Sequence, residues 1–597
     1  MKKNIFKAKI LFLSLWGGLL TGCVDMDYNP ASSISENGFW RDAADAKTAV
    51  TGVYDSWKNV YGWIWLSDGW TDLANDNGIQ AGTGYSPTFW NKSKRDVKMG
   101  THGMGTFDDL WALNYQCINR ANEAITNTAK LPTGTTANAL LLKQYDGELR
   151  FLRAACYFNL LDMFGSVPYF ERKLTNEEAI TMSKMSRPDI KDKIISDMDS
   201  AVKYLPISYP ASEHGHFTKG AAIAFRGKIK LFWASWQERD AKRAIGGDFP
   251  GDLADADKYY KDAAVDFAEA MKSTYKYGLF KNGAVGTFSE IFTLTNESCN
   301  EIMISIKYQG GAIGQGQNMS GHCLGTRSIG NSGTWFTPIP ELWNVFQDKT
   351  TGDFATPVTY GNGTGANDII NNTAFANRDL RMGATVVLHG SSMFAIASGT
   401  GAVGTTPLVF NVRQQNNEAK GWLRSDTPNN LAFRKMVTQW PGQLTRSDDA
   451  YDIPLMRYAD VMLMYAEAMN KAYGPSTEVY TQIDKLRTRG GLPALDKVKY
   501  ASKEDVHKAI VQERKAELIL ESGCRYSDIR RWGLVEEIFG GNKGFVFKAF
   551  DNTDKTNIYA RRFENATARE FQRYYIQNIP LAEIVRNPNL LPQNPEW

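Results

Sequence analysis

The sequence of 597 residues predicts a mostly α-helical fold, in which paired helices form a scaffold beside an irregular, loop-rich region with short β-strands. Two observations lead to this prediction. Apolar residues recur at three- and four-residue steps in the first and the last parts of the chain, as they do along one face of a helix. Between about 277 and 450 this periodicity gives way to Gly, Thr, Asn and Ser with short β-like runs.

The helical periodicity is clearest in "ELRFLRAACYFNLLDMFG", where Leu149, Leu152, Cys156 and Leu160 form one stripe. In "RYADVMLMYAEAMNKA" alanines stand where a neighbouring helix can approach closely. Helix pairs with small residues at their contacts resemble tetratricopeptide repeats. We expect helices over the following ranges: 38–60, 105–129, 138–164, 188–204, 218–238, 254–275, 454–471, 476–489 and 503–522. The last three are expected to pack back onto the earlier ones.

The middle region contains two runs that read as β-strands, "EIMISIKY" at 301–308 and "ATVVLHG" at 384–390. The Gly-rich stretches between such runs have the composition of long loops. Loops of this length in a compact protein are usually functional or mobile. The region is therefore a second place, beside the aromatic segment described below, to look for a binding surface.

Charge and cysteine usage exclude several classes of protein. The 68 basic and 65 acidic residues nearly balance, so no basic surface for nucleic acid is indicated. The six cysteines include no CxxC pair, and most of them are expected to be buried structural residues. His214 and His216 in "EHGHF" lack further ligands nearby, so we expect a loop there and no metal site. No cofactor is predicted, and a structural calcium ion is left open.

The first residues indicate export. A basic stretch, "MKKNIFKAK", precedes the apolar run "ILFLSLWGGLL" at 10–20. A membrane-spanning helix needs about 20 residues, so this shorter run is typical of a signal peptide. Residues 1–22 are accordingly predicted to be removed, leaving 23–597 as the mature chain.

The run ends in "LTGC", with an apolar Leu20, two small residues and Cys23. This pattern resembles the bacterial lipobox, which implies lipid transfer to the sulfur of Cys23, cleavage before it and acylation of the new amine. Several acyl chains, such as palmitate, would hold the protein firmly on a membrane, whereas one chain is marginal. The alternative is an ordinary secretory signal that happens to end near a cysteine.

Aromatic residues crowd into 61–90, a segment rich in Gly, Asn and Asp. A sugar ring has a face of C–H groups and a rim of hydroxyls, so its site needs flat rings beside polar side chains. The candidate binding residues in this segment are Trp63, Trp65, Trp70, Asn75, Asp76, Tyr85 and Trp90. Trp63, Trp65 and Trp70 could equally be core residues. Tyr308 and Trp335 in the middle region are further candidates.

Three carboxylates, Glu513, Glu517 and Glu521, are spaced so that they share one helical face. A pair of carboxylates could hydrolyse a glycosidic bond. Arginines follow closely, however, and paired acids and guanidiniums commonly form structural networks. We favour the structural role, with Arg514, Arg525, Arg530 and Arg531 as the nearby cations, and we predict no catalytic residue.

Several segments in shared order resemble the SusD/RagB family of outer-membrane lipoproteins of Bacteroidetes. The resembling segments, beside the lipobox, are "ENGFW", "ELRFLRAACYFNLLDMFGSVPYF", "RYADVMLMYAEAMN", "IDKLRTRGGLP", "QERKAELILESGCRYSDIRRWG" and "YYIQNIPLAEIVRNPNLLPQNPEW". The resemblance implies one domain over 23–597, with helical parts at 23–276 and 451–597 and a loop-rich insert at 277–450.

The resemblance also implies a function: a cell-surface protein that binds oligosaccharide or polysaccharide without cleaving it and passes it to a TonB-dependent, SusC-like transporter. Rings of the early and middle segments are expected to lie together in an arc. The alternative is a helical-repeat lipoprotein that binds peptides or only scaffolds the transporter.

Overall fold

The computed structural model covers residues 1–597. It describes residues 39–64, 67–68, 71–76, 106–243, 249–310, 316–317, 319, 323, 336–339, 341–358, 368–369, 371, 375–396, 403–410, 422–423, 431–437, 449–539, 546–550, 558–562, 573–595 and 597.

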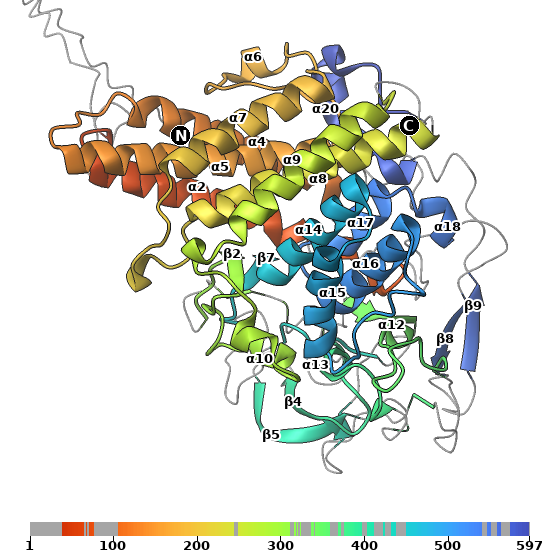
Figure 1. Ribbon diagram of the computed structural model, residues 1–597. Coiled ribbons are helices and arrows are strands. Elements are labelled where there is room, and N and C mark those ends of the chain that lie inside the picture. Colours follow the sequence, from red (N-terminus) through yellow and green to blue (C-terminus); the bar gives the residue numbers. More distant parts are fainter. Residues whose placement is uncertain are drawn as a thin grey trace, which may run out of the picture.

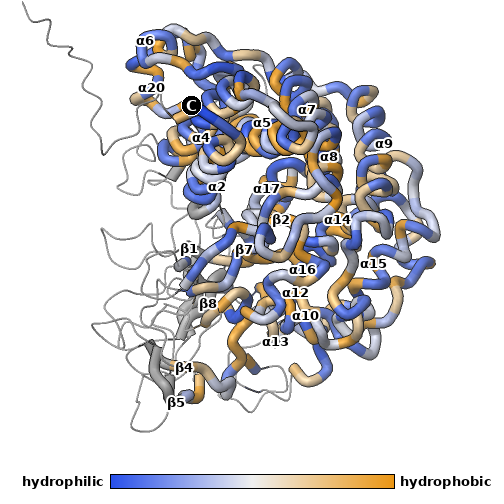
Figure 2. Tube along the Cα trace, turned by 90° about the vertical axis from the view of Figure 1, so that its left-hand side faces the viewer, coloured by the Kyte–Doolittle hydropathy of each residue, from blue (hydrophilic) through white to orange (hydrophobic). Residues whose placement is uncertain are grey.

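Long helices form the scaffold, as predicted. They are α2 (Ala43–Ile64), α4 (Thr106–Thr128), α5 (Thr136–Phe164), α7 (Arg187–Tyr204), α8 (Lys219–Arg243), α9 (Leu253–Ala270), α14 (Tyr458–Tyr473), α15 (Thr477–Arg489) and α16 (Lys503–Leu518). Successive helices contact one another, and α14 contacts both α8 and α9. Along the curve from α4 to α15 in Figure 2 the helices follow one another, so the later ones pack onto the earlier ones as expected.

Helix α5 shows why the scaffold forms. Thr135 caps its first turn by accepting a hydrogen bond from the backbone N–H of Asn138, and the chain turns away at Gly165, whose φ is 72°. The predicted stripe, including Leu149, Leu152 and Cys156, is fully buried. The other faces of α5 are buried as well, because α2, α4 and α7 all contact it.

Shorter elements occupy the remaining described parts (Figure 1). The short helices include α6 (Asn176–Ala179), α10 (Phe288–Ile291), α12 (Glu341–Val345), α13 (Arg381–Thr385), α17 (Cys524–Arg531), α18 (Val535–Phe539) and α20 (Leu581–Arg586), with 3-10 turns such as η4 (Ala211–Glu213). The strands are β1 (Ala74–Asp76), β2 (Ile302–Ile306), β3 (Phe336–Pro338), β4 (Ser392–Ile396), β5 (Val403–Phe410), β6 (Trp422–Leu423), β7 (Ile453–Arg457), β8 (Val546–Phe550) and β9 (Ile558–Arg562).

The strands pair in small sheets. Three are antiparallel pairs, β1 with β3, β2 with β7 and β8 with β9, and the fourth has the order β4-β5-β6. The run at 301–308 was predicted to be β-like, and β2 confirms it. The prediction of short strands within the loop-rich region is therefore confirmed.

The predicted secondary structure of two segments was wrong. Residues 454–457 belong to strand β7 rather than to a helix, because a short, fully buried apolar run has no period that separates strand from helix. The run 384–390 is not a strand: it begins in the last turn of α13, and Val386 forms only an isolated bridge with Phe433.

Two helices also end earlier than predicted. Helix α9 stops at Ala270 instead of 275, and α16 stops at Leu518 instead of 522. After α16 the chain turns sharply, with positive φ at Leu520, Ser522 and Gly523, before α17 begins. Of the cysteines, Cys117, Cys156, Cys323 and Cys524 are buried, as predicted for structural residues.

Candidate functional site

The early aromatic segment meets the middle region through strands β1 and β3. Their antiparallel register sets Ala74 opposite Pro338, Asn75 opposite Thr337 and Asp76 opposite Phe336. The pairing continues where the N–H of Ile339 donates to the carbonyl of Leu73 at 3.0 Å. Two parts of the chain that are far apart in sequence therefore lie side by side, about 5 Å apart at each pair.

This pairing includes or adjoins three of the predicted binding residues, Asn75, Asp76 and Trp335. Asn75 and Asp76 form β1, and Trp335 directly precedes β3. Trp63 lies in the last turn of α2. The side chains of Trp63, Asn75 and Asp76 lie outside the described part of the structure, as do the following residues entirely: Trp65, Trp70, Tyr85, Trp90 and Trp335.

The C-terminal part of the chain anchors the start of β1. Arg525, in the first turn of α17, donates from Nε and Nη2 to the two carboxylate oxygens of Asp72, each at 2.7 Å. Lys515 of α16 adds an ion pair to Asp72 at 3.3 Å. Burial would raise the pKa of Asp72, but Arg525 and Lys515 outweigh it and hold that pKa well below its usual range.

Asp68 forms a second anchor in the same segment. Its Oδ1 accepts the backbone N–H of Arg525 at 3.2 Å, and its carbonyl accepts the hydroxyl of Thr71 at 2.7 Å. The side chain is fully buried. Burial raises its pKa to about 8, opposed by the backbone N–H of Arg525. Asp68 is therefore largely protonated at neutral pH.

Tyr308 is the one predicted binding residue whose side chain the structure describes. Its ring is half-buried and packs against the main core, two residues beyond the end of β2. Its N–H donates to Oδ1 of Asp452 at 2.8 Å, and Nζ of Lys58 lies 6.0 Å from the ring centre. Burial, followed by the charge of Asp452, raises the Tyr308 pKa to about 12, so its hydroxyl stays neutral.

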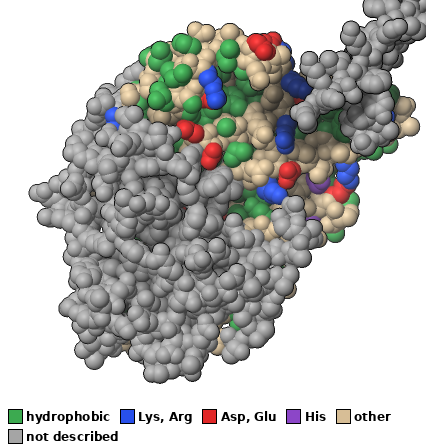
Figure 3. Space-filling view, turned by 180° about the vertical axis from the view of Figure 1, so that it is seen from behind, with side chains coloured by type: hydrophobic (Ala, Val, Ile, Leu, Met, Phe, Trp, Pro, Cys, Tyr) green, Lys and Arg blue, Asp and Glu red, His purple; other side chains and the backbone are tan. Residues whose placement is uncertain are grey.

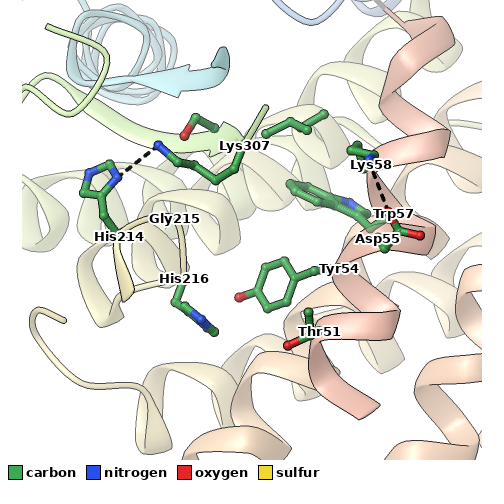
Figure 4. A pocket seen from close by; sticks show the side chains of 11 residues that line it. Thr51, Tyr54, Asp55, Trp57, Lys58, His214, Gly215, His216 and Lys307 are labelled. Carbon is green, nitrogen blue, oxygen red and sulfur yellow. Dashed lines mark hydrogen bonds and ion pairs between the residues drawn. The ribbon is translucent and has the colours of Figure 1, made fainter. Parts of the chain in front are cut away.

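A cavity of about 240 Å³ lies next to Tyr308. Its lining residues are Thr51, Tyr54, Asp55, Trp57, Lys58, His214, Gly215, His216, Ser305, Ile306 and Lys307. Figure 4 shows the side chains from α2 on one side, facing those of the histidine turn on the other. The volume is below the ~300–1,000 Å³ of typical ligand sites, so the cavity suits a single small group.

A buried carboxylate organises one wall of this cavity. Glu148 of α5 accepts from the hydroxyls of Tyr54 at 2.8 Å and Tyr209 at 2.9 Å, and its Oε2 lies 2.6 Å from Nδ1 of His216. The hydrogen bond to Glu148 raises the pKa of His216 against the effect of burial. His216 is thus held in place as a polar group on the cavity wall.

Two amines also line the cavity, those of Lys58 and Lys307. Lys307 forms an ion pair with Asp452, and its Nζ lies 3.4 Å from Nδ1 of His214. Lys58 forms an ion pair with Asp55 at 3.2 Å. Polar groups thus surround an apolar patch that includes Trp57 and Ile306.

The sequence drew attention to the histidine turn but missed the lysines. His214 and His216 follow η4 in a turn, as the loop prediction required. Lys58 and Lys307 gave no signal, because a single lysine on a helix or after a strand is usually only solvated. In the part of the chain that the structure describes, no group of three or more His, Cys, Asp or Glu residues is arranged to hold a metal ion.

The three glutamates considered as catalytic lie in a buried ion network. Glu517 accepts from Nη1 of Arg381 at 3.1 Å and from Arg489, and it pairs with Arg457 at 3.0 Å. It has no exposed surface. Burial would raise its pKa, but the arginines lower it to about 2. A glycan therefore has no access to this carboxylate.

The network is structural as predicted, but its cations were predicted wrongly. Glu513 pairs with Arg381 at 2.9 Å, and Glu521 pairs with Lys435 at 2.5 Å. The arginines close in sequence pair elsewhere: Arg514 with Asp460, Arg525 with Asp72, Arg530 with Asp162 and Arg531 with Glu467. Tertiary contacts, not sequence proximity, select the partners.

The surface agrees with the near-neutral composition. On the described part of the face in Figure 3, acidic and basic side chains are interspersed, and hydrophobic ones gather toward one end. Within the described ranges, no helix combines the length and the apolar character needed to cross a bilayer. The predicted signal peptide and Cys23 lie outside the described residues.

These features define a class of protein: a helical-repeat protein in which two segments distant in sequence pair as strands β1 and β3 beside the scaffold. The three glutamates considered as catalytic, Glu513, Glu517 and Glu521, are all buried. Comparison with known families specifies it further. Residues 300–597 match the model described as the SusD family, and residues 38–231 match the model described as starch-binding associating with outer membrane. The chain belongs to the SusD family.

Relatives match over nearly the whole chain. SusD-like protein P2 of Formosa agariphila is 25% identical over 99% of this chain and 100% of its own. A SusD-like protein of Bacteroides fragilis has a solved structure that matches with a TM-score of 0.69 at 22% identity, covering 94% of this chain and 98% of that one.

A second Bacteroides fragilis structure, described as a SusD-like carbohydrate binding protein, matches with a TM-score of 0.65 at 21% identity, covering 93% and 100% of the two chains. These structures confirm the predicted fold: mostly helical, with tetratricopeptide-like pairs and short strands.

Proposed function

We propose that this protein is a non-catalytic glycan-binding lipoprotein of the outer membrane, which captures an oligosaccharide or polysaccharide at the cell surface. The observation that carries this function is the pairing of β1 with β3, which joins Asp76 to Phe336 in the ladder. Tyr85 and Trp90 follow β1 in the sequence and Trp335 precedes β3; we propose that their rings contact one sugar chain.

The comparisons support the same function. One matching family model is described as starch-binding, and a structural relative is described as a carbohydrate binding protein. The burial of Glu513, Glu517 and Glu521 supports binding without cleavage, because none of these carboxylates is accessible to a sugar. We propose that Tyr308 and the small cavity beside it also contribute to glycan binding, with room for a single sugar group against the cavity walls.

Delivery follows from the proposed location. Cys23 would carry the lipid anchor, and the nearly neutral scaffold would lie at the membrane surface. There it would associate with a TonB-dependent, SusC-like transporter and pass the bound glycan into its pore. Isolation of the tagged protein from native membranes, without added crosslinker, is expected to co-purify a β-barrel of that class.

Affinity electrophoresis through gels that contain individual polysaccharides tests glycan binding. We expect one polysaccharide to retard the protein, and we expect each of four variants to weaken that retardation by removing a ring: Tyr85→Ala, Trp90→Ala, Tyr308→Ala and Trp335→Ala. Tyr473, which is 61% exposed at the end of α14, provides the matched control. Tyr473→Ala should migrate like the unmodified protein.

The alternative, a lipoprotein that binds peptides or only holds the transporter, predicts a different result. Retardation would then be absent with every polysaccharide, and a peptide library would be bound instead. Retardation that Tyr473→Ala reduces as much as Trp90→Ala would also contradict the proposed face.

A further inference from the structure

A second cavity, of about 550 Å³, lies among helices of the scaffold. Its lining includes side chains of α8, α9, α14, α16 and α18, and we call it the interhelical cavity. It shares no lining residue with the cavity of Figure 4. Its volume falls within the ~300–1,000 Å³ of typical small-molecule sites. The scaffold therefore has room for a ligand at a place distinct from the cavity beside Tyr308.

Trp532, directly after α17, gives this cavity an aromatic surface that is held in place. Its Nε1 donates to Glu467 at 2.6 Å, and His507 of α16 packs edge-on against it with 5.0 Å between ring centres. The guanidinium of Arg531 lies 4.3 Å from the ring centre, and because Arg531 is fully buried, that part of the ring is closed to solvent. Trp532 itself is half-buried and lines the cavity. Its remaining surface is a rigid apolar platform, of the kind that packs against the C–H face of a sugar ring.

Glu238 of α8 brings two lysines together in the lining. It pairs with Lys242 at 2.6 Å and with Lys471 of α14 at 3.0 Å, and it accepts from the hydroxyl of Tyr260 at 2.6 Å. Burial would raise the pKa of Glu238, but Lys471 and Lys242 lower it to about 2, so the carboxylate stays ionised. The side chains of Lys242 and Lys471 are 62% and 21% exposed. An ammonium group has three donor hydrogens, so both lysines keep donors for a ligand.

Glu536 of α18 supplies an acceptor. Its Oε2 accepts from Arg243 and from the hydroxyl of Tyr575, and its side chain is 37% exposed. Within the described part of the chain, its Oε1 accepts from no other group. Gly533 holds Arg243 in place, because a Cβ there would lie 2.4 Å from Nε of Arg243. The lining therefore presents a carboxylate oxygen in a fixed position, with capacity for a ligand.

The charged side chains of the lining each have at least one partner of opposite charge, so none of them requires a counter-ion from a ligand. His507 adds no charge, because burial, followed by the charge of Lys471, lowers its pKa to about 4. The ion pairs of the lining are Glu238 with Lys242 and Lys471, Arg243 with Glu536, Arg239 with Asp240 and Arg531 with Glu467.

This mixture of accessible donors and acceptors favours a neutral ligand with hydroxyl groups. An anion in the cavity would be repelled by Glu238 and Glu536, and a cation would be repelled by the lysines. A hydroxyl donates one hydrogen bond and accepts two, so it can bond to a carboxylate and to an ammonium group at once. A sugar carries several hydroxyls around an apolar ring face, which matches the polar groups beside Trp532.

We propose that the interhelical cavity binds a neutral sugar, either a monosaccharide or the end of an oligosaccharide. The C–H face of the sugar lies on Trp532, its hydroxyls accept from Lys242 and Lys471, and one hydroxyl donates to Oε1 of Glu536. This site goes beyond the proposed glycan-binding residues and does not depend on them. A protein with two separate sugar sites can hold one polysaccharide at two points, which raises its overall affinity.

The test labels the protein with fluorotryptophan and follows the fluorine resonance of Trp532, which Trp532→Phe identifies by its disappearance. Glucose, galactose, mannose, xylose, arabinose, fucose and N-acetylglucosamine are added separately, with succinate and spermidine as charged controls. We expect at least one sugar to shift this resonance in a saturable manner and both controls to leave it unchanged. No saturable shift with any sugar overturns the proposal. A saturable shift with succinate or spermidine also overturns it.

Lys242→Met tests the proposed hydrogen bonds. The variant keeps most of the aliphatic side chain but removes the donors, and its exposed position makes a folding defect unexpected. The affinity for the responding sugar should fall about tenfold, the effect of losing one hydrogen bond to a charged group.

Lys258→Met is the matched control. The side chain of Lys258 is 60% exposed and pairs with Asp262 one turn along α9, as Lys242 pairs with Glu238 along α8. It should keep the affinity of the unmodified protein. An unchanged affinity in Lys242→Met, or an equal loss in both variants, overturns the proposed contacts.

Trp90→Ala separates this site from the proposed glycan-binding residues. It is expected to weaken retardation by polysaccharide and to leave the sugar-induced shift of Trp532 unchanged. If no polysaccharide retards the protein while a sugar shifts Trp532, the proposed function fails and the interhelical site stands. Loss of the shift in Trp90→Ala overturns the interhelical site, because the resonance would then report binding elsewhere.

Discussion

Arg525 and Asp72 form a two-bond ion pair that joins parts of the chain 453 positions apart. Both side chains are buried, and the pair anchors the start of β1 to the start of α17. Because β1 in turn pairs with β3, one ion pair between distant residues positions the segment from which glycan contacts are proposed.

Removing one partner of this pair should destabilise the protein strongly. Arg525→Ala leaves the Asp72 carboxylate buried with only Lys515 near it, so we expect a loss of about 3–5 kcal/mol in the free energy of unfolding. Urea denaturation followed by circular dichroism measures it. Arg172→Ala breaks an exposed pair with Glu178 and should change stability little, since water screens that pair. Equal losses in both variants would contradict the anchoring role.

Neutralising the network carboxylate should affect folding and not chemistry. Glu517→Gln leaves the guanidiniums of Arg381, Arg457 and Arg489 without that charge, so we expect a loss of about 3–5 kcal/mol in stability at neutral pH. A reducing-sugar assay is expected to detect no product with either protein. Polysaccharide cleavage that disappears in Glu517→Gln would show that the carboxylate is catalytic instead.

The same variant has a defined pH dependence. The folded state lowers the pKa of Glu517 from 4.5 to about 2, so its stabilisation is present above pH 4.5 and disappears as the pH falls toward 2. As the pH falls from 4.5 to 2, the free energy of unfolding of Glu517→Gln should therefore decrease less than that of the unmodified protein. Glu504→Gln, at an exposed position in the first turn of the same helix, is the control and should follow the unmodified protein.

Asp68 should give the opposite pH dependence. Its pKa rises from 3.8 to about 8 on folding, so the unfolded chain loses this proton first, and stability falls as the pH rises from 3.8 through 8. Asp68→Asn removes this loss of stability. Denaturation at pH 5 and at pH 8.5 should therefore give two free energies of unfolding that differ less for the variant than for the unmodified protein. Asp257→Asn, at an exposed site on α9, should retain the full difference. No reduction in Asp68→Asn would mean that the carboxyl is already ionised.

Cys23 should decide where the protein is found. Cys23→Ala removes the sulfur that would carry the lipid, so the folded protein is expected in the soluble fraction while it still binds its polysaccharide. Membrane fractionation in cells without the transporter measures this directly. Retention of the variant in the membrane fraction would contradict lipid anchoring through this residue.

The spacing of apolar residues was sufficient to predict most helices of the scaffold. It was insufficient where a segment is buried by parts of the chain that are distant in sequence. Leu149, Leu152 and Cys156 showed their helical face through spacing alone, and all are buried on α5. The β7 segment was misread because Ile453–Arg457 is buried throughout, and burial on every side leaves no period to detect. Its strand character depends on β2, which lies far away in the sequence.

The sequence by itself determined the helical scaffold and the family, because both follow from spacing and short motifs, and it contains the motif on which the proposed lipidation of Cys23 rests. Only the tertiary structure decided which charges meet. Glu517 pairs with Arg381, Arg457 and Arg489 rather than with the neighbouring arginines, and Arg525 pairs with Asp72. The sequence does not show which partner a charged side chain will have. The partner in a buried ion pair is selected by the packing of helices that are distant in the chain.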